Sequence, residues 1–321
     1  MRDLTADKGP GWATRVSEIL GVRYPIILGP MRMITMGEMA AAVSNAGGFG
    51  QIGASGLSGP ELRAEIAKAK ALTDKPFGIN VPVYRENAFE AIEIAIESGI
   101  KTITTSAGNP AKIMSLARSG NLTVIHKASS VKLAKKAEDA GVDAVIAMGF
   151  EAGGHVGREN ITTMCLVPQV VDAVRIPVIA AGGIADARGI AAAFALGAAG
   201  VEMGTRFVAS AESPVPGFFK DGLVCADCDA TLLLGKEAMP IRVLKNKVTA
   251  IVAGLASNEA DSAMVSSGDA AYVMQGGDRD TAVMPCGQIA GLIGSVKSVA
   301  EIMDELVSGV AVIARSFSAF G

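Results

Sequence analysis

The sequence has few aromatic residues and little net charge. Phe, Trp and Tyr make up 4% of the 321 residues, and Lys and Arg nearly balance Asp and Glu, for a formal net charge of −3. Nucleic-acid-binding domains usually carry a basic surface and aromatic side chains on which bases stack. The composition therefore argues against a nucleic-acid partner.

Long uninterrupted apolar runs are also missing. The most apolar region, residues 176–203, is broken by Asp186, Arg188 and glycines, whereas a membrane-spanning helix needs about 20 largely apolar residues. Residues 1–12 are charged and contain Gly9-Pro10-Gly11, unlike a signal peptide. We therefore expect a cytoplasmic protein that makes no use of a membrane.

Cysteine and histidine are scarce, with four and two residues. Cys225 and Cys228 form a CxxC pair, but a zinc site would need a second pair or histidines at ligand spacing. His126 and His155 both lie far from this pair in the sequence. We predict two ordinary thiols and no metal site.

The sequence does contain a repeating pattern of short apolar segments, each leading into an Ala-rich helical segment. The pattern recurs roughly every 20–30 residues, as βα units do. The eight expected strands are residues 24–28, 49–52, 77–81, 102–104, 122–126, 144–147, 177–180 and 200–203. Eight such units close into a (β/α)8 TIM barrel. An open doubly wound sheet would carry GxGxxG after its first strand, and this sequence lacks it.

The expected strands end well before the chain does. We therefore assign residues 1–212 to the barrel and residues 213–295 to a mostly helical lobe inserted after the eighth strand. A final helix over residues 299–317 is expected to return to the barrel, so residues 296–321 form a third part.

Glycines follow the last two expected strands. Ala181, Gly182 and Gly183 follow the seventh strand, and Gly204 and Thr205 follow the eighth. Active sites of such barrels lie at the carboxyl ends of the strands, and glycine allows backbone N–H groups to approach an anion. We predict a phosphate-binding site here, although these glycines could instead only form tight turns.

The loop after the sixth expected strand, residues 149–157, is rich in glycine. It carries Glu151, Gly153, Gly154 and His155. Because histidine transfers protons near neutral pH, we predict that His155 acts in catalysis or substrate binding. Glu151 could orient a neighbour, bind a cofactor hydroxyl group or be a solvated loop carboxylate.

Two more polar side chains end expected strands. Asn80 ends the third and can both donate and accept hydrogen bonds, which suits the edge of a polar ring; capping of the next helix is the alternative. Lys127 ends the fifth and suits a phosphate or an electron-rich ring, unless it reaches the surface. His126 points to the other side of that strand, where we predict packing.

Sequence segments around these residues resemble a known protein family. The segments YPIILGPM at 24–31, AVSNAGGFG at 42–50, KPFGIN at 75–80, EAGGHVG at 151–157, PVIAAGGIAD at 177–186 and GTRF at 204–207 resemble the nitronate monooxygenase (2-nitropropane dioxygenase) family. That family also contains flavin-type enoyl-ACP reductases and an NADH:quinone reductase branch. The resemblance covers about residues 15–210 and returns weakly at 241–249 and 286–293.

The resemblance implies non-covalent FMN at the top of the barrel, with His155 as the catalytic histidine. Residues 29–31 would line the flavin ring, and the glycines after the last two strands would hold the phosphate. The residues so implied to contact FMN are Gly29, Pro30, Met31, Asn80, Lys127, Gly153, Gly154, Gly182, Gly183, Gly204 and Thr205, and we add Ala181 and Glu151 to this set.

Within this family, the first interpretation is oxidation of alkyl nitronates by dioxygen, with His155 as base or anion holder. The alternative is an NAD(P)H-dependent enoyl-ACP (enoyl-thioester) or quinone reductase, with acyl carrier protein as partner in the enoyl case. Met148 and Glu202 stand where many nitronate monooxygenases have Gln. A flavin-free lyase or isomerase and a non-enzymatic FMN-binding protein are the other classes. Each of these interpretations predicts a small-molecule substrate or ligand. The sequence allows a homodimer.

Overall fold

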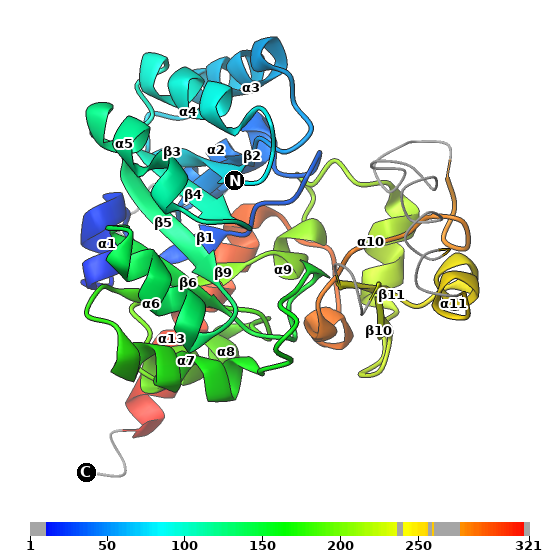
Figure 1. Ribbon diagram of the computed structural model, residues 1–321. Coiled ribbons are helices and arrows are strands. Elements are labelled where there is room, and N and C mark those ends of the chain that lie inside the picture. Colours follow the sequence, from blue (N-terminus) through cyan, green and yellow to red (C-terminus); the bar gives the residue numbers. More distant parts are fainter. Residues whose placement is uncertain (1–10, 236–239, 256–258, 260–276, 318–321) are drawn as a thin grey trace.

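Eight parallel strands form the central barrel (Figure 1) of this computed structural model, which describes residues 11–235, 240–255, 259 and 277–317. The strands are β1 (Ile26–Leu28), β2 (Gly50–Gly53), β3 (Phe77–Pro82), β4 (Thr102–Ser106), β5 (Thr123–Ala128), β6 (Ala144–Met148), β8 (Val178–Ala181) and β9 (Gly200–Met203). Their order is β1-β9-β8-β6-β5-β4-β3-β2, and a parallel bridge between Ile27 and Phe49 joins the two ends. The predicted TIM-barrel fold is confirmed.

Helices surround this barrel because its apolar strands are buried on both faces. The outer helices are α2 (Gly37–Asn45), α3 (Gly59–Leu72), α4 (Ala88–Glu97), α5 (Ala111–Ser119), α6 (Val131–Asp139), α7 (Thr163–Ala173) and α8 (Ala187–Ala195). The C-terminal helix α13 (Val299–Phe317) packs against α8 and α2, so it fills the remaining gap in the ring.

The barrel interior has an apolar layer toward the amino-terminal ends of the strands (the lower layer) and a polar layer toward their carboxyl ends (the upper layer). Ile125, Ile146 and Ile179 pack in the lower layer with residues of α1 (Arg15–Leu20), which closes the amino-terminal end. Side chains alternate along a strand, so Lys127 shares the inner face of β5 with Ile125. The inner side chains near the carboxyl ends of the strands are Gln51, Asn80, Thr104, Lys127 and Glu202.

A smaller lobe lies beside the carboxyl ends of the strands (Figure 1). After the single turn α9 (Thr205–Val208), its described elements are α10 (Gly217–Val224), β10 (Thr231–Leu234), β11 (Ile241–Leu244), α11 (Lys247–Ala253) and the 3-10 helix η2 (Gln288–Leu292). The two strands were not predicted from the sequence. They form a three-stranded antiparallel sheet with β7 (Gly154–His155), which belongs to a barrel loop. We propose the same three-part division of the chain, at residues 212 and 295; part of the lobe and residues 318–321 lie outside the described residues.

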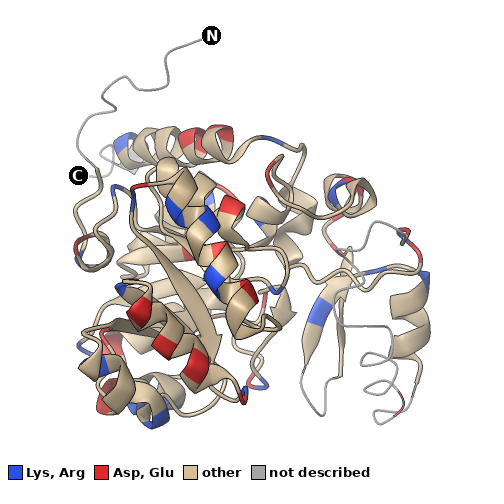
Figure 2. Cartoon of the chain, turned by 90° about the horizontal axis from the view of Figure 1, so that it is seen from above, with Lys and Arg blue, Asp and Glu red and all other residues tan. Residues whose placement is uncertain are grey.

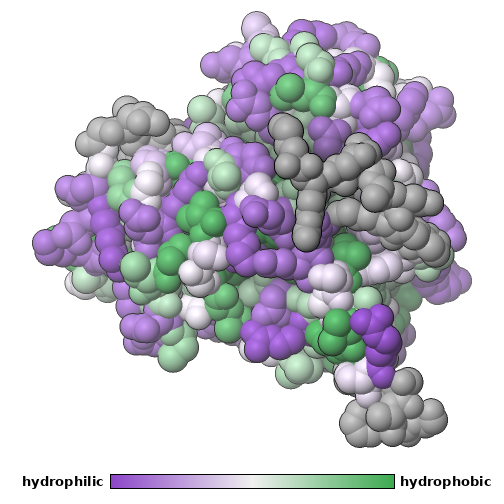
Figure 3. Space-filling model, turned by 180° about the vertical axis from the view of Figure 1, so that it is seen from behind, coloured by the Kyte–Doolittle hydropathy of each residue, from purple (hydrophilic) through white to green (hydrophobic). Residues whose placement is uncertain are grey.

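Charged residues lie mainly on the outer helices and loops, and both signs are mixed there (Figure 2). On the face drawn in Figure 3, apolar residues occur in separate patches among hydrophilic ones. Among the described helices, none combines the length and the apolar character needed to cross a membrane.

Candidate active site at the carboxyl ends of the barrel strands

The predicted phosphate-binding residues lie together at one end of the barrel. Ala181 ends β8, and Gly182 and Gly183 follow it with φ of +88° and +72°, a conformation that favours glycine. Gly204 and Thr205 follow the neighbouring strand β9. Within the described part of the chain, the N–H groups of Gly183 and Gly204 donate to no other residue, so both are available to an anion.

Thr205 connects this end of the barrel to the lobe. Its buried hydroxyl accepts a hydrogen bond of 2.9 Å from the backbone N–H of Gly287. The hydroxyl hydrogen is then free to point toward a ligand. The helix that begins at Thr205 is only one turn long, so the individual N–H groups matter more here than a helix dipole.

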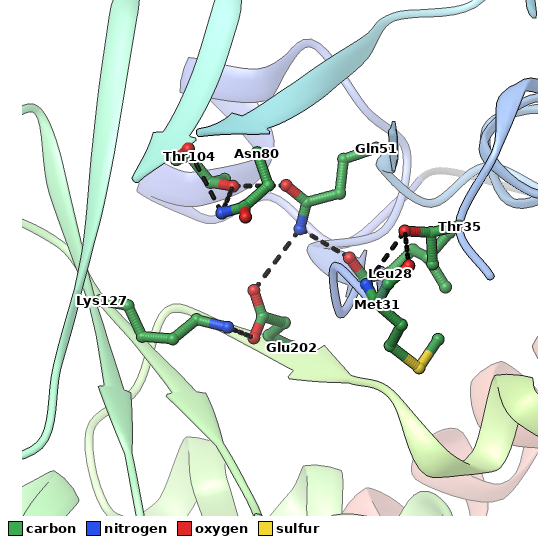
Figure 4. A network of polar contacts seen from close by, with 8 residues as sticks. All are labelled: Leu28, Met31, Thr35, Gln51, Asn80, Thr104, Lys127 and Glu202. Carbon is green, nitrogen blue, oxygen red and sulfur yellow. Dashed lines mark hydrogen bonds and ion pairs between the residues drawn. The ribbon is translucent and has the colours of Figure 1, made fainter. Parts of the chain in front are cut away.

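Residues 29–31 pass directly beside Gly204. The N–H of Gly29 donates to the carbonyl oxygen of Met203, and a Cβ on Gly29 would lie 3.1 Å from the Cα of Gly204. Pro30 follows in the same turn. Met31 is held by Thr35, whose hydroxyl accepts from the Met31 N–H at 3.0 Å (Figure 4). The turn after β1 therefore lies next to the loops after β8 and β9, which are predicted to bind phosphate.

The loop that carries His155 is fixed by the lobe. Gly154 and His155 form β7, which pairs with Arg242 and Ile241 of β11. Gly153 lies against the segment that contains Cys286, where a Cβ on Gly153 would come within 2.5 Å of that residue's carbonyl carbon. Only glycine fits this contact, so the close packing of loop on lobe explains Gly153.

His155 itself is exposed at the mouth of the barrel. Surrounding protein atoms, and secondly the positive charge of Arg85 in the loop after β3, lower the pKa of the imidazole below its ordinary value of 6.5. His155 is therefore neutral at neutral pH. A neutral imidazole can accept a proton at one nitrogen and donate a hydrogen bond from the other.

Glu151 caps helix α7. Its carboxylate accepts hydrogen bonds from the Thr163 N–H at 2.9 and 3.0 Å and from the Thr163 hydroxyl at 3.1 Å. The single proton of that hydroxyl is shared between this carboxylate and the carbonyl oxygen of Gly182, which lies 2.9 Å from the hydroxyl oxygen. Of the roles considered from the sequence, orienting neighbouring residues is the one these contacts support; a cofactor contact stays a prediction.

Asn80 and Lys127 belong to one polar network in the upper barrel (Figure 4). Lys127 Nζ lies 2.5 Å from Glu202 Oε1, and Asn80 Nδ2 donates to Thr104 Oγ1 at 2.9 Å. Gln51 lies between them: its Oε1 accepts from Thr104 Oγ1 at 2.5 Å, and its Nε2 donates to the Leu28 carbonyl at 2.6 Å. Sequence reasoning did not assign site roles to Gln51 and Thr104, although each is a polar residue on the inner face of an apolar strand.

Arg242 was also not recognised from the sequence. It is 4% exposed, and its guanidinium group donates to the carbonyl oxygen of Phe150. A single arginine in the apolar strand β11 was the available signal, but its partner lies 92 residues away along the chain.

Two expectations lie outside this site. His126 is buried, shares a 2.8 Å hydrogen bond with the Thr105 hydroxyl, and has a pKa lowered to about 4 by burial, which confirms its packing role. Cys225 and Cys228 are free and exposed.

Comparisons of sequence place the chain among known proteins. A family model described as nitronate monooxygenase matches residues 13–309. The (3aS,4S,5R,7aS)-5-hydroxy-7a-methyl-1-oxo-octahydro-1H-indene-4-carboxyl-CoA dehydrogenase of Rhodococcus jostii (strain RHA1) is 38% identical over 232 residues, which cover 72% of this chain. The match spans 65% of that relative, just under two thirds of its length. A Staphylococcus saprophyticus protein described as "Probable nitronate monooxygenase" is 36% identical over 256 residues, 66% of this chain and 72% of the relative.

Solved structures extend the similarity to the lobe. FabK from Thermotoga maritima superposes with a TM-score of 0.92 at 38% sequence identity, covering 97% of this chain and 100% of that chain. A nitroalkane oxidase from Streptomyces ansochromogenes superposes with a TM-score of 0.77 at 25% identity, covering 94% of this chain and 99% of that chain.

Proposed function

This chain belongs to the nitronate monooxygenase family, whose members are FMN-dependent oxidoreductases, and from that premise we propose that it is an NAD(P)H-dependent enoyl-thioester reductase. The substrate would be an α,β-unsaturated acyl group carried as a thioester on acyl carrier protein or coenzyme A. Hydride is added to the β-carbon and a proton to the α-carbon of the C=C bond.

The residues at the barrel mouth fit FMN. The free N–H groups of Gly183 and Gly204 and the hydroxyl of Thr205 can donate to a phosphate group. The amide nitrogen of Asn80 is engaged by Thr104, so its amide oxygen is left as an acceptor for a ring N–H. Lys127 supplies an ammonium group in the same layer. These residues, with Met31, are the ones we propose to hold FMN.

The observation that carries the proposal is the extent of the similarity to FabK, an enoyl-ACP reductase of this family. It includes nearly the whole chain and therefore the lobe, which supplies the strand that pairs with the His155 loop. The Rhodococcus relative is also named for a coenzyme A thioester. Thioesters are thus the shared substrate class of these two relatives.

The mechanism follows from the position and charge of His155. When bound, FMN would supply the hydride, after reduction by NAD(P)H. His155 is exposed at the mouth and neutral, so its N–H can donate a hydrogen bond to the thioester carbonyl oxygen. This bond draws electrons from the β-carbon and stabilises the negative charge that develops on the oxygen. The α-carbon proton comes from solvent, to which His155 is open.

Nitronate oxidation, the first interpretation from the sequence, is the second candidate. The neutral imidazole of His155 favours it, because only the unprotonated ring can take a proton from a nitroalkane. The Staphylococcus relative and the family model carry the same description.

Anaerobic mixing of the FMN-loaded protein with candidate reductants distinguishes the two functions. We expect NADH or NADPH to bleach the flavin absorbance, and crotonyl thioesters then to restore it. Bleaching by propyl nitronate alone, with no response to either nicotinamide, would replace enoyl reduction by nitronate oxidation. Reduction by a nicotinamide with reoxidation by quinones only would indicate a quinone reductase.

A further inference from the structure

We propose that Glu202 is a positioning residue that neutralises Lys127 and fixes its ammonium group beneath the ring of bound FMN, so that the pair sets the redox potential of the cofactor. This inference rests on the FMN binding proposed above.

The pair spans the barrel interior. Lys127 comes from β5 and Glu202 from β9, and their side chains are 13% and 5% exposed at a separation of 2.5 Å. Buried ion pairs add little net stability, because desolvation offsets the attraction, and apolar replacements are often neutral or stabilising. Folding alone therefore gives little reason for a charged pair at this depth.

The carboxylate is the anchored member of the pair. Glu202 Oε2 lies 3.5 Å from Gln51 Nε2, and Gln51 is itself held by the Leu28 carbonyl and the Thr104 hydroxyl (Figure 4). Lys127 has Glu202 as its hydrogen-bond partner in the described part of the chain. The direction of the ammonium group is thus set by Glu202.

The pair also lies at the same depth in the barrel as the residues proposed to bind FMN. Glu202 is the register partner of Ala181, which directly precedes Gly182. Lys127 lies in the same polar layer as Asn80. A charge at this depth acts on a ligand above it through protein rather than through water, so its effect is weakly screened.

Removing only one member should therefore change the charge below the ring. Glu202→Gln leaves Lys127 without a counter-charge, which favours the electron-rich reduced cofactor. Lys127→Met leaves a carboxylate, which disfavours it. The double variant Lys127→Met/Glu202→Gln restores zero net charge.

The test measures FMN dissociation constants, by flavin fluorescence, and midpoint potentials of the reloaded proteins. For Glu202→Gln we expect the affinity for reduced relative to oxidised FMN to rise about tenfold, which for a two-electron couple is about 30 mV more positive. Lys127→Met should shift the potential in the opposite direction, and the double variant should return to within about threefold of wild type. The control is Glu305→Gln on α13, which breaks the exposed ion pair of Glu305 with Lys297 and should change neither the FMN dissociation constants nor the potential.

The outcomes separate the inference from the proposed function. A wild-type protein that does not bind FMN would overturn both. FMN binding with an unchanged potential in Glu202→Gln, or equal shifts in the single and double variants, would overturn the role of the pair alone. If Glu202→Gln does not fold, the sign of the shift in Lys127→Met decides.

Discussion

The guanidinium group of Arg242 lies over the ring of Phe150, with its central carbon 4.9 Å from the ring centroid, and donates to the carbonyl oxygen of the same residue at 2.9 Å. Arg242 belongs to the lobe and Phe150 to the loop that carries His155. The lobe therefore holds the proposed catalytic loop by a side-chain contact as well as by the pairing of β11 with β7.

Arg242→Met should weaken this hold without touching the phosphate loops. We expect turnover to fall by about 10–100-fold, because small displacements of a reacting group are costly, while the FMN dissociation constant stays within about threefold. Steady-state turnover of a crotonyl thioester and fluorescence titration of FMN measure the two effects. The control is Lys245→Met. Lys245 is an exposed lobe residue that pairs with Asp229, so this variant should behave as wild type. Equal loss of FMN binding and turnover would show that Arg242 only stabilises the fold.

His155→Ala should lower the turnover of thioesters by about 10²–10³-fold, as expected for loss of one positioned hydrogen-bond donor to a developing oxyanion. FMN binding should persist, because the proposed phosphate and ring contacts come from other residues. Steady-state kinetics together with the flavin spectrum check this. Unchanged turnover would move the chemistry to another residue.

With a nitroalkane as substrate, the acid limb of the activity profile should reflect His155, because only the unprotonated ring can take a proton. Its pKa is lowered in the folded protein, first because surrounding protein atoms partly desolvate the exposed ring and then by the charge of Arg85, so the neutral ring persists to a pH below 6.5 and activity should fall only below that value. Arg85→Gln removes the second cause and should move the limb upward, part of the way to 6.5. Profiles of kcat/KM for both proteins measure this. An unmoved limb would exclude Arg85 as a partner of His155.

Gly183→Ala should weaken FMN binding by about tenfold or more. A methyl group at this residue would lie 3.4 Å from the Glu151 carboxylate, beside the N–H proposed to bind phosphate. Gly141→Ala is a matched control: Gly141 also has a positive φ, +87°, and a methyl group there would meet nothing within 4 Å. Both variants carry a backbone cost of about 1–2 kcal/mol. If both bind FMN alike, these glycines only form turns.

The cysteines should divide into three reactive and one protected thiol. Cys165, Cys225 and Cys228 are exposed, whereas Cys286 is fully buried and burial raises its pKa to about 12. Native iodoacetamide treatment at pH 8 should add three labels by mass spectrometry, and the fourth only after unfolding. Rapid fourfold labelling of the native protein would contradict the packing of the segment around Cys286.

The sequence by itself determined the barrel, because eight apolar segments followed by helices have few other ways to bury their surface. It also placed the glycine loops at one end, since parallel strands all end there. Only the tertiary structure showed the sheet of β10, β11 and β7, because its strands are short and one consists of two loop residues, Gly154 and His155. Likewise, the contacts of Lys127 with Glu202 and of Arg242 with Phe150 join residues 75 and 92 positions apart. Local patterns carry no record of such pairs, and their geometry is set only when the barrel closes and the lobe docks on it.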